Sequence, residues 1–362
     1  MVLVVGIDFG SSLIKAASGD AEFVSPGIMG EYNEGWSGMA SDKSWENNLC
    51  IHVGYDAEGN LVKQFFGEIA RKQSEVKRAI TGSGIKNLDH VEMAVKVSMA
   101  ILAIATGTID PGVQDVQEIE CIATVGVPIA TQREKMKNLS QRLKGTKEIV
   151  IENDNTKKII QLRVHVTSCM VVYGPYGSYV QLLQEFKENT AVDAVITDIG
   201  FGSAEILSIY DGRPNTLASA SIPDLSLETL AHRIALALQD QTGKIIKGLD
   251  LMHLLQEGQS MVIIGGERLD ISELKSYYVE AIANSLTDEI IDLVSKLPPD
   301  ARIKYYIFTG DGVDLFWKDL ELALYQKNLI QDMDQAAHPK DYRIANARGF
   351  EFIATSRFKK TR

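Results

Sequence analysis

The chain opens with two apolar runs joined by a short polar turn, a pattern typical of a β-hairpin. Residues 2–7 are unbroken apolar sequence, and residues 13–17 form a second, mainly apolar run. The turn between them, residues 8–12, contains Gly10 and two serines, which suit a tight reversal between antiparallel strands. A P-loop leads from a strand into a helix, so this strand–turn–strand order predicts a different kind of site.

The same pattern returns near the middle of the chain. Residues 194–197 predict a strand, residues 198–203 a glycine-rich turn and residues 204–209 a second strand. Asp8 and Asp198 begin the two turns and lie 190 positions apart, about half the chain. This spacing predicts an internal repeat on the scale of a domain.

Alternating strands and helices are expected in the rest of the chain. Helices are predicted where apolar positions recur every three or four residues, and strands where short apolar runs lie between turns. The expected helices are residues 67–73, 91–106, 131–143, 176–189, 225–242, 249–257, 272–297, 315–325 and 344–358. The further expected strands are residues 51–53, 61–65, 120–126, 149–151, 159–166, 215–220, 261–264, 268–271 and 304–308. Residues 20–48 and 74–87 are expected to be irregular surface segments.

The composition is that of a folded globular chain. Of its 362 residues 45% are hydrophobic and 23% charged, which excludes a disordered protein and predicts two domains. Because the net charge is −11, the chain as a whole does not attract phosphate backbones, and we expect no direct nucleic-acid binding. Its three cysteines have neither zinc nor disulfide spacing and indicate a reducing compartment. Neither a signal peptide nor a membrane span is expected, so we predict a cytoplasmic protein without membrane contact.

The first turn carries residue types that suit a metal-bound phosphate. Gly10 lets a backbone N–H approach a phosphate closely, and Ser11 and Ser12 add hydroxyl donors. Lys15 supplies a positive charge. Asp8, at the end of the strand, is placed to hold Mg²⁺, which favours one or two carboxylates together with phosphate oxygens. Taken alone, an Asp-x-Gly turn is equally compatible with a plain hairpin.

The second turn favours the functional interpretation of the first. It repeats the pattern with Asp198, Gly200, Gly202 and Ser203. Two such turns at matching positions are improbable as coincidence. One hairpin from each half could therefore hold a triphosphate and its metal from both sides.

A third glycine-rich turn follows the strand at residues 304–308. Gly310 and Gly312 flank Asp311 immediately before a predicted helix. Two glycines allow the backbone to lie against a planar ligand such as adenine. Asp311 is also compatible with a simple acidic residue at a helix N-terminus.

Four segments together resemble the actin, sugar-kinase and heat-shock-chaperone ATPase superfamily. Residues 5–15 (VGIDFGSSLIK) resemble its phosphate-1 motif, and residues 198–205 its phosphate-2 motif. Residues 309–313 resemble the adenosine motif, and residues 344–350 are similar to the second connecting helix. Their order, spacing and total length most resemble ParM-like plasmid-segregation actins and related archaeal actins.

This resemblance implies a two-domain α/β actin-like fold, which is a duplicated ribonuclease H-like fold, with a nucleotide cleft between the domains. Domain I is expected at residues 1–170, with an inserted smaller subdomain, and is completed by the C-terminal helix at residues 344–362. Domain II is expected at residues 171–343, with a smaller subdomain at about 225–300.

The resemblance also implies a function. ATP (or GTP) with Mg²⁺ would bind, the chain would polymerise head to tail, and hydrolysis would occur within the filament, which would serve plasmid segregation through a DNA-binding adaptor. The segments 20–48 and 74–87, with Trp36 and Trp45, would form filament contacts, although buried anchors suit the tryptophans equally. Asp8 and Asp198 would lie by the metal. The remaining motif residues would lie by the phosphates or the adenosine: Gly10, Ser11, Ser12, Lys15, Gly200, Gly202, Ser203, Gly310, Asp311 and Gly312.

One departure from the family pattern concerns catalysis. The first connecting helix of these ATPases usually starts with a Glu or Gln that orients the attacking water, and here that position falls near Gly174 or Tyr176. Glu205, seven residues after Asp198, is the candidate replacement, acting with Asp198 and Asp8; an exposed strand carboxylate is the alternative. Two other functions stay open: a small-molecule kinase of the same superfamily, and a non-hydrolysing nucleotide-dependent scaffold.

Overall fold

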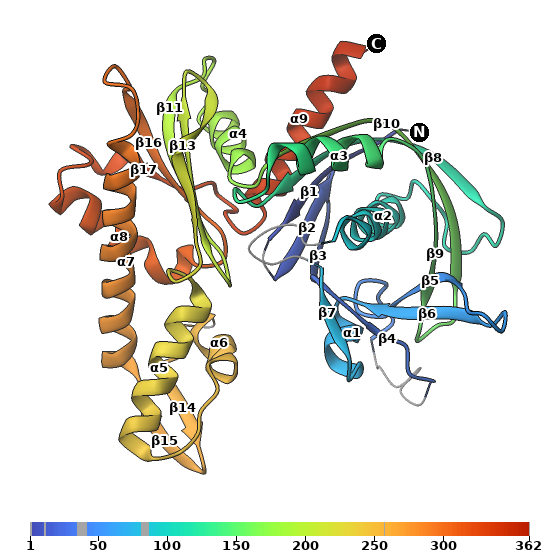
Figure 1. Cartoon of the computed structure of the whole chain (residues 1–362), viewed down its shortest axis with the longest axis horizontal. Helices are drawn as coiled ribbons and strands as arrows, with labels where there is room; N and C mark the ends of the chain where they lie inside the picture. The colour runs from blue at the N-terminus through green and yellow to red at the C-terminus, as the bar shows by residue number, and fades with distance from the viewer. Residues whose placement is uncertain (1, 11, 35–41, 81–86, 257, 362) are drawn as a thin grey trace. The chain divides into compact units, whose positions relative to one another are not determined.

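The computed structural model divides the chain into two compact units (Figure 1). It describes residues 2–10, 12–34, 42–80, 87–256 and 258–361. Unit 1 comprises Met1–Val180 and Asn346–Arg362, and unit 2 comprises Gln181–Ala345. The chain passes from unit 1 to unit 2 within helix α4, Tyr176–Glu185, whereas the sequence-based boundary at residues 170 and 171 lies inside a strand.

Unit 1 is built on one large sheet, in which ten strands of the described residues have the order β3-β2-β1-β8-β10-β9-β5-β6-β4-β7. The strands are β1 Val2–Phe9, β2 Leu13–Ser18, β3 Ala21–Pro26, β4 Ile28–Glu31, β5 Leu49–Tyr55, β6 Leu61–Phe66, β7 Lys77–Ala79, β8 Gln117–Val127, β9 Gly145–Asn153 and β10 Ile159–Tyr173. Strands β1, β8 and β10 run parallel to one another, and β2 and β3 continue the sheet beyond β1 in antiparallel sense.

Four further helices belong to unit 1: α1 Glu68–Gln73, α2 Leu88–Ala105, α3 Arg133–Leu143 and α9 Ala345–Thr361. The apolar face of α2 packs against β1, β2 and β3 and forms much of the core of the unit. Helix α9 lies so close to β1 that a Cβ at Gly6 would come within 2.0 Å of the Ala347 carbonyl oxygen. Glycine at position 6 therefore permits this contact.

Unit 2 has a smaller sheet of order β13-β12-β11-β16-β17 and a separate hairpin, β14–β15. The strands are β11 Asp193–Ile199, β12 Ala204–Tyr210, β13 Arg213–Ile222, β14 Met261–Ile264, β15 Glu267–Asp270, β16 Ile303–Thr309 and β17 Ala336–Ala337. The helices are α5 Leu227–Thr242, α6 Gly248–Gln256, α7 Ser272–Val294 and α8 Val313–Gln326. The predicted apolar stripe of α7 is confirmed by the burial of Ile282, Leu286 and Ile290.

The two sheets share one topology. In unit 1 the order β3-β2-β1-β8-β10 consists of three antiparallel strands followed by two parallel ones. In unit 2 the order β13-β12-β11-β16-β17 shows the same arrangement, with two antiparallel pairings followed by two parallel ones. The duplicated two-domain α/β fold is thus confirmed.

Two segments expected to be irregular contain strands. Within residues 20–48 the structure has β3 and β4, and within residues 74–87 it has β7. In β3 the side chains alternate, with Phe23 and Ser25 buried and Glu22 and Val24 exposed. Because the buried face includes a serine and the exposed face a valine, the sequence lacks the hydrophobic alternation that predicts a strand. Trp45 packs, partly buried, against the core, whereas Trp36 lies outside the described residues.

The three cysteines are free thiols in the interior. Burial raises the pKa of Cys50 and of Cys169 to about 12, and it raises the pKa of Cys121 as well. At neutral pH these thiols are protonated core side chains. Among the helices of the described residues, none has the length and apolar character needed to cross a bilayer.

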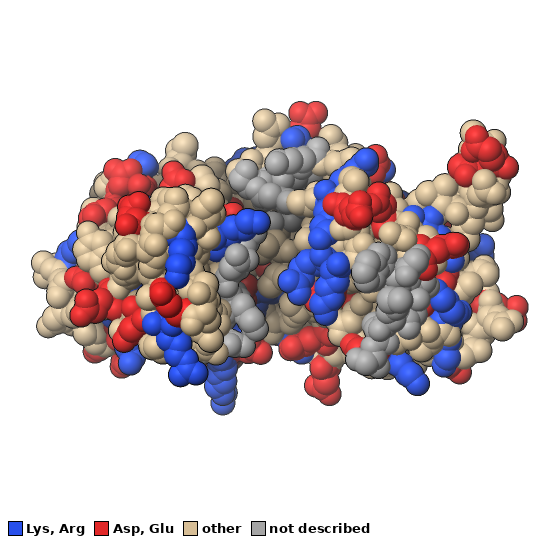
Figure 2. All heavy atoms as spheres, turned by 90° about the horizontal axis from the view of Figure 1, so that it is seen from below, with Lys and Arg blue, Asp and Glu red and all other residues tan. Residues whose placement is uncertain are grey.

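Acidic and basic side chains are interspersed on the surface drawn in Figure 2. Helix α1 shows the same mixture on a local scale. Glu68 forms ion pairs with Arg71 at 2.6 Å and with Lys72 at 2.9 Å. The hydrogen bond from Arg71, followed by that from Lys72, outweighs desolvation and lowers the pKa of Glu68 to about 2.

Candidate functional site

The first hairpin places Asp8 and Lys15 side by side. The two residues are cross-strand partners in β1 and β2, so their side chains share one face of the sheet. Both are largely buried, with 7% and 9% of their surfaces exposed. The Gly10 N–H donates to the Leu13 carbonyl at 3.0 Å and closes the turn. Ser12 is half-buried, and Ser11 lies outside the described residues.

The Asp8 carboxylate lies against backbone that lacks side chains. Gly126, next to last in β8, is the neighbour of Asp8 in β1, and Gly174 follows β10. A Cβ at Gly126 would lie 3.1 Å from Asp8 Oδ1, and a Cβ at Gly174 would lie 3.5 Å from the same oxygen. The parallel strands thus bring two glycines to the carboxylate, and the Phe350 ring of α9 fills the place that a side chain at Gly126 would take.

A buried hydrogen-bond chain orients Asp8 from the other side. The Asn346 amide, in the first turn of α9, donates from Nδ2 to Asp8 Oδ2 at 3.2 Å. Asn346 Oδ1 accepts from the Ser178 N–H at 3.1 Å and from the Ser178 hydroxyl at 2.6 Å. A backbone N–H can only donate, so the contact with Ser178 fixes which end of the amide faces Asp8.

Sequence reasoning placed Asn346 in a connecting-helix motif but assigned it no role. Asn346 and Asp8 are 338 positions apart, and no spacing rule relates them. Ser178 was missed as well. The only signal available was the polar Asn346 between Ala345 and Ala347, at the start of an otherwise buried helix turn.

The second hairpin has the same cross-strand pairing and the same turn hydrogen bond as the first. Asp198 and Glu205 are cross-strand partners in β11 and β12, and the Gly200 N–H donates to the Ser203 carbonyl at 3.0 Å. Glu205 is 8% exposed and accepts a hydrogen bond from the Ser221 hydroxyl at 2.8 Å. Asp198 thus occupies the position of Asp8, and Glu205 the position of Lys15.

The turn of the second hairpin is held by a helix start. The N–H of Leu227 donates to the Gly200 carbonyl at 3.3 Å, and the N–H of Glu228 donates to the Phe201 carbonyl at 2.9 Å. These donors belong to the first turn of α5, whose N–H groups have no partner within the helix. The contact fixes the turn while Gly202 beyond it stays half-buried.

The third glycine-rich turn packs directly on the second hairpin. Gly310 has φ of 89°, and a Cβ there would lie 2.2 Å from Asp198 Oδ1. The Gly312 N–H donates to the Ile199 carbonyl at 2.9 Å, and a Cβ at Gly312 would lie 2.4 Å from the Ile199 side chain. The structure therefore brings Gly310, Gly312 and the half-buried Asp311 next to Asp198. Both glycines serve this close packing.

In each unit by itself, the turn aspartate is a residue type that fits a magnesium ion shared with phosphate. In the described part of the chain, no three His, Cys, Asp or Glu side chains come together as a metal cage. Mg²⁺ commonly uses one or two carboxylates and takes its other ligands from phosphate and water. Asp8, bordered by two glycines, and Asp198, bordered by Gly310, are carboxylates of that kind.

The start of α4 offers no group to orient an attacking water. Gly174 donates its N–H to the Val127 carbonyl at 2.8 Å and faces Asp8 without a side chain. Burial raises the pKa of the Tyr176 phenol, which keeps it protonated at neutral pH. Glu205, the cross-strand partner of Asp198, is a hairpin carboxylate that stands directly beside a turn aspartate.

Duplicated sheets with one aspartate-ended hairpin in each unit define an actin-like fold. Residues 6–177 match the family model described as the N-terminal domain of actin-like proteins. Over these residues the chain is similar to actin-like proteins. No sequence among curated proteins matches it.

Solved structures of the same fold match along the whole chain. The actin-like protein Alp7A has a TM-score of 0.73 at 14% identity, over 100% of this chain and 98% of its own. An archaeal actin homologue has a TM-score of 0.69 at 16% identity, over 98% and 99%. A Bacillus thuringiensis ParM solved with ATP has a TM-score of 0.68 at 14% identity, over 99% of both chains. At these identities the likeness is one of fold.

Proposed function

We propose that this chain binds ATP with Mg²⁺ and polymerises into dynamic filaments, with ATP hydrolysis in the filament. The observation that carries the proposal is the repeated hairpin: Asp8 and Asp198 stand at the same register position in two units of the same topology. A ParM of this fold was solved with ATP, which supports the choice of nucleotide.

In this proposal both hairpins contact the phosphates of one nucleotide. The N–H groups around Gly10 and Gly202 and the Ser12 and Ser203 hydroxyls are the donors to phosphate oxygens. Lys15 adds positive charge from the first hairpin. The residues that would hold Mg²⁺ are Asp8 and Asp198. When bound, the ion neutralises phosphate charge.

The third turn is proposed as the adenosine contact. Gly310, Asp311 and Gly312 form a turn that packs on the second hairpin beside Asp198. The closeness of the turn to Asp198 supports a single ligand that meets both features.

Glu205 is proposed to orient the attacking water. It stands beside Asp198 on the same face of the sheet, and the Ser221 hydroxyl holds one of its carboxylate oxygens. Such a residue accepts the proton of water as the bond to phosphorus forms.

The glycine at position 174 favours a second function, a scaffold that assembles with ATP but does not hydrolyse it. The position at which relatives of the resembled superfamily carry the water-orienting Glu or Gln falls near Gly174 or Tyr176, and neither residue is a carboxylate or an amide. If Glu205 does not act on water, filaments would form with ATP and persist.

Electron microscopy and light scattering of the purified protein with ATP, ADP and a non-hydrolysable ATP analogue test the proposal, with phosphate release measured in parallel. Assembly with ATP and release of phosphate are expected. Assembly without release would identify the scaffold. ATP binding without assembly at any salt or protein concentration would overturn the filament proposal and favour a small-molecule kinase.

Matched variants test the site itself. Asp8→Asn and Asp198→Asn keep the side-chain shape but remove the charge, and each is expected to weaken Mg-ATP binding by at least roughly tenfold. Asp240→Asn, at an exposed position of α5, is the control and should bind as the parent does. Unchanged Mg-ATP binding in both site variants would show that the two hairpins do not bind the nucleotide.

We further propose that the filaments move plasmid DNA through a DNA-binding adaptor in the cytoplasm. The net charge of −11 opposes direct contact with a phosphate backbone and supports an intermediary. Co-sedimentation of filaments with a candidate adaptor, with and without its DNA site, tests this step. Sedimentation of naked DNA with filaments in the absence of adaptor would contradict it.

A further inference from the structure

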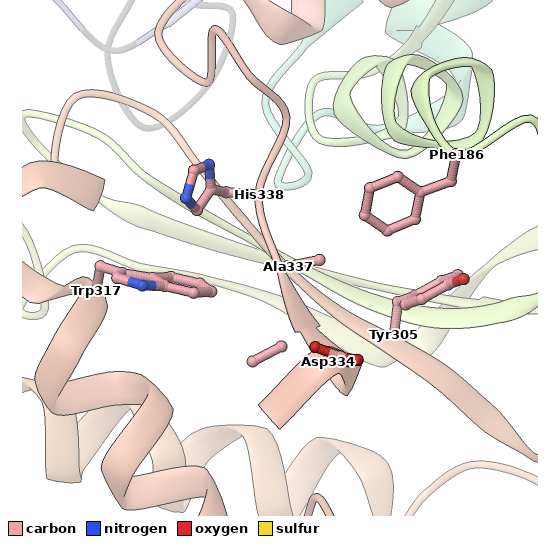
Figure 3. A pocket seen from close by; sticks show the side chains of 7 residues that line it. Phe186, Tyr305, Trp317, Asp334, Ala337 and His338 are labelled. Carbon is pink, nitrogen blue, oxygen red and sulfur yellow. The ribbon is translucent and has the colours of Figure 1, made fainter. Parts of the chain in front are cut away.

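Unit 2 has a cavity of about 440 Å³ at the open edge of its sheet, and its lining residues do not belong to either glycine-rich turn of the unit. Figure 3 shows four rings around β17 and one carboxylate among them. Phe186 follows α4, Tyr305 belongs to β16, Trp317 to α8, and His338 follows β17. The cavity is at the small end of the range for ligand sites and suits one side chain or a head group of that size.

The sequence of β17 creates the space. Ala336 and Ala337 line the cavity with single methyl groups, between aromatic residues supplied by other elements. The edge strand has no strand partner on its outer side among the described residues, because β17 is the last strand in the sheet order. A segment of another protein can therefore approach the cavity along this edge.

Ring-to-ring contacts hold the walls in place. Phe186 packs edge-on against Tyr305 at 5.4 Å, and His338 packs edge-on against Trp317 at 4.8 Å. His338 Nδ1 lies 2.9 Å from the Pro339 carbonyl, which only accepts, so Nδ1 carries the proton and the ring orientation is fixed. The cavity is thus formed before a ligand arrives.

The chemistry of the walls favours a cation. The Asp334 carboxylate lies between Trp317 and Tyr305 in Figure 3, is exposed, and forms no ion pair within the described residues. Aromatic faces attract cations through their quadrupole, and the molecule already shows one case. Lys304 Nζ lies 5.2 Å above the Tyr305 ring and also pairs with Glu188.

We propose that this cavity binds the guanidinium group of an arginine side chain on a surface segment of a partner protein. A guanidinium is flat, stacks on aromatic rings and pairs with a carboxylate in a fork, so Asp334 and the rings recognise it together. An anionic or phosphate-bearing ligand would be repelled by Asp334. The overall charge of −11 attracts a basic partner from a distance.

The test is an NMR titration of the full chain with the peptide acetyl-Gly-Arg-Gly-amide and with its citrulline counterpart. Citrulline has the shape of arginine without the charge. The chain has three tryptophans, so three indole N–H signals are expected, and Trp317→Phe identifies the one in the cavity. The Trp317 signal should shift with the arginine peptide, and the citrulline peptide should bind at least roughly tenfold more weakly.

Three variants complete the experiment. Asp334 and Phe186 are both exposed. Asp334→Asn is expected to weaken the binding of the arginine peptide roughly tenfold, and Phe186→Leu is expected to weaken it a few-fold. Asp292→Asn, an exposed residue of α7, is the matched control and should leave binding unchanged. The other two indole signals report that each variant is folded. No shift with the arginine peptide, equal binding of the citrulline peptide, or full binding to Asp334→Asn would each overturn the proposal.

Discussion

Replacing Gly310 by alanine perturbs the closest contact of the candidate site. The residue has φ of 89°, a backbone conformation that side chains disfavour. The new Cβ would lie 2.2 Å from Asp198 Oδ1 and 2.7 Å from the Ile199 carbonyl oxygen. The carboxylate can rotate away, but the carbonyl belongs to the backbone of β11 and cannot. The strand end and the turn must therefore move apart.

Two effects lower the stability of the Gly310→Ala variant. The positive φ alone costs about 1–2 kcal/mol for alanine, and forcing extra volume into packed surroundings costs about 1–3 kcal/mol more. Gly266→Ala is a matched control, because Gly266 has φ of 84° and its Cβ would meet no atom within 4 Å. Gly266→Ala therefore has the cost of the positive φ without the cost of the extra volume.

Urea denaturation followed by circular dichroism measures the free energy of unfolding, and fluorescence of a labelled ATP measures binding. Gly310→Ala is expected to lose about 1–3 kcal/mol more stability than Gly266→Ala, and it should weaken ATP binding because Asp198 is displaced. Gly266→Ala should bind ATP normally. Equal loss of stability in both variants would show that Gly310 is not pressed against β11.

Three further outcomes are expected. Asn346→Ala removes the buried donor to Asp8, so it should lower the free energy of unfolding by about 1–3 kcal/mol and weaken ATP binding; unchanged binding would show that Asp8 needs no orientation. Glu205→Gln should slow phosphate release by at least roughly tenfold while filaments still form, and an unaltered rate would exclude Glu205 from hydrolysis. The hydrogen bond from Arg71 lowers the pKa of Glu68 from its ordinary 4.5 to about 2, so its ion pairs stabilise the fold above pH 4.5 and that stabilisation is lost as pH falls toward 2. Glu68→Gln should therefore reduce the acid-induced loss of stability by about 1 kcal/mol, after allowance for solvent screening; identical acid denaturation curves would contradict this.

Much of the fold follows from local patterns in the sequence. Both hairpins were predictable because unbroken apolar runs flank turns rich in glycine and serine. The long helix α7 was predictable from its apolar stripe. The strand β17 was not, because two alanines after a polar turn have no periodicity. Strand β3 was missed because its exposed residues and nearby glycines hide an alternation that burial makes plain.

The turn residues of the candidate site could be named from the sequence, but their contacts could not. The pairing of Asp198 with Glu205 follows from the hairpin register once the turn is placed. The link from Asn346 to Asp8, and the approach of Gly126 and Gly174 to the same carboxylate, depend on parallel strands and a helix far apart in the chain. Such contacts arise from tertiary packing, which no local pattern contains.

The repeated register has a consequence for the chemistry of the two hairpins. The scaffold is duplicated, yet opposite each aspartate the partner differs: a lysine on β2 in one copy and a glutamate on β12 in the other. One hairpin therefore pairs an acid with a base and the other pairs two acids, so a single change of residue type makes two otherwise equivalent positions chemically distinct.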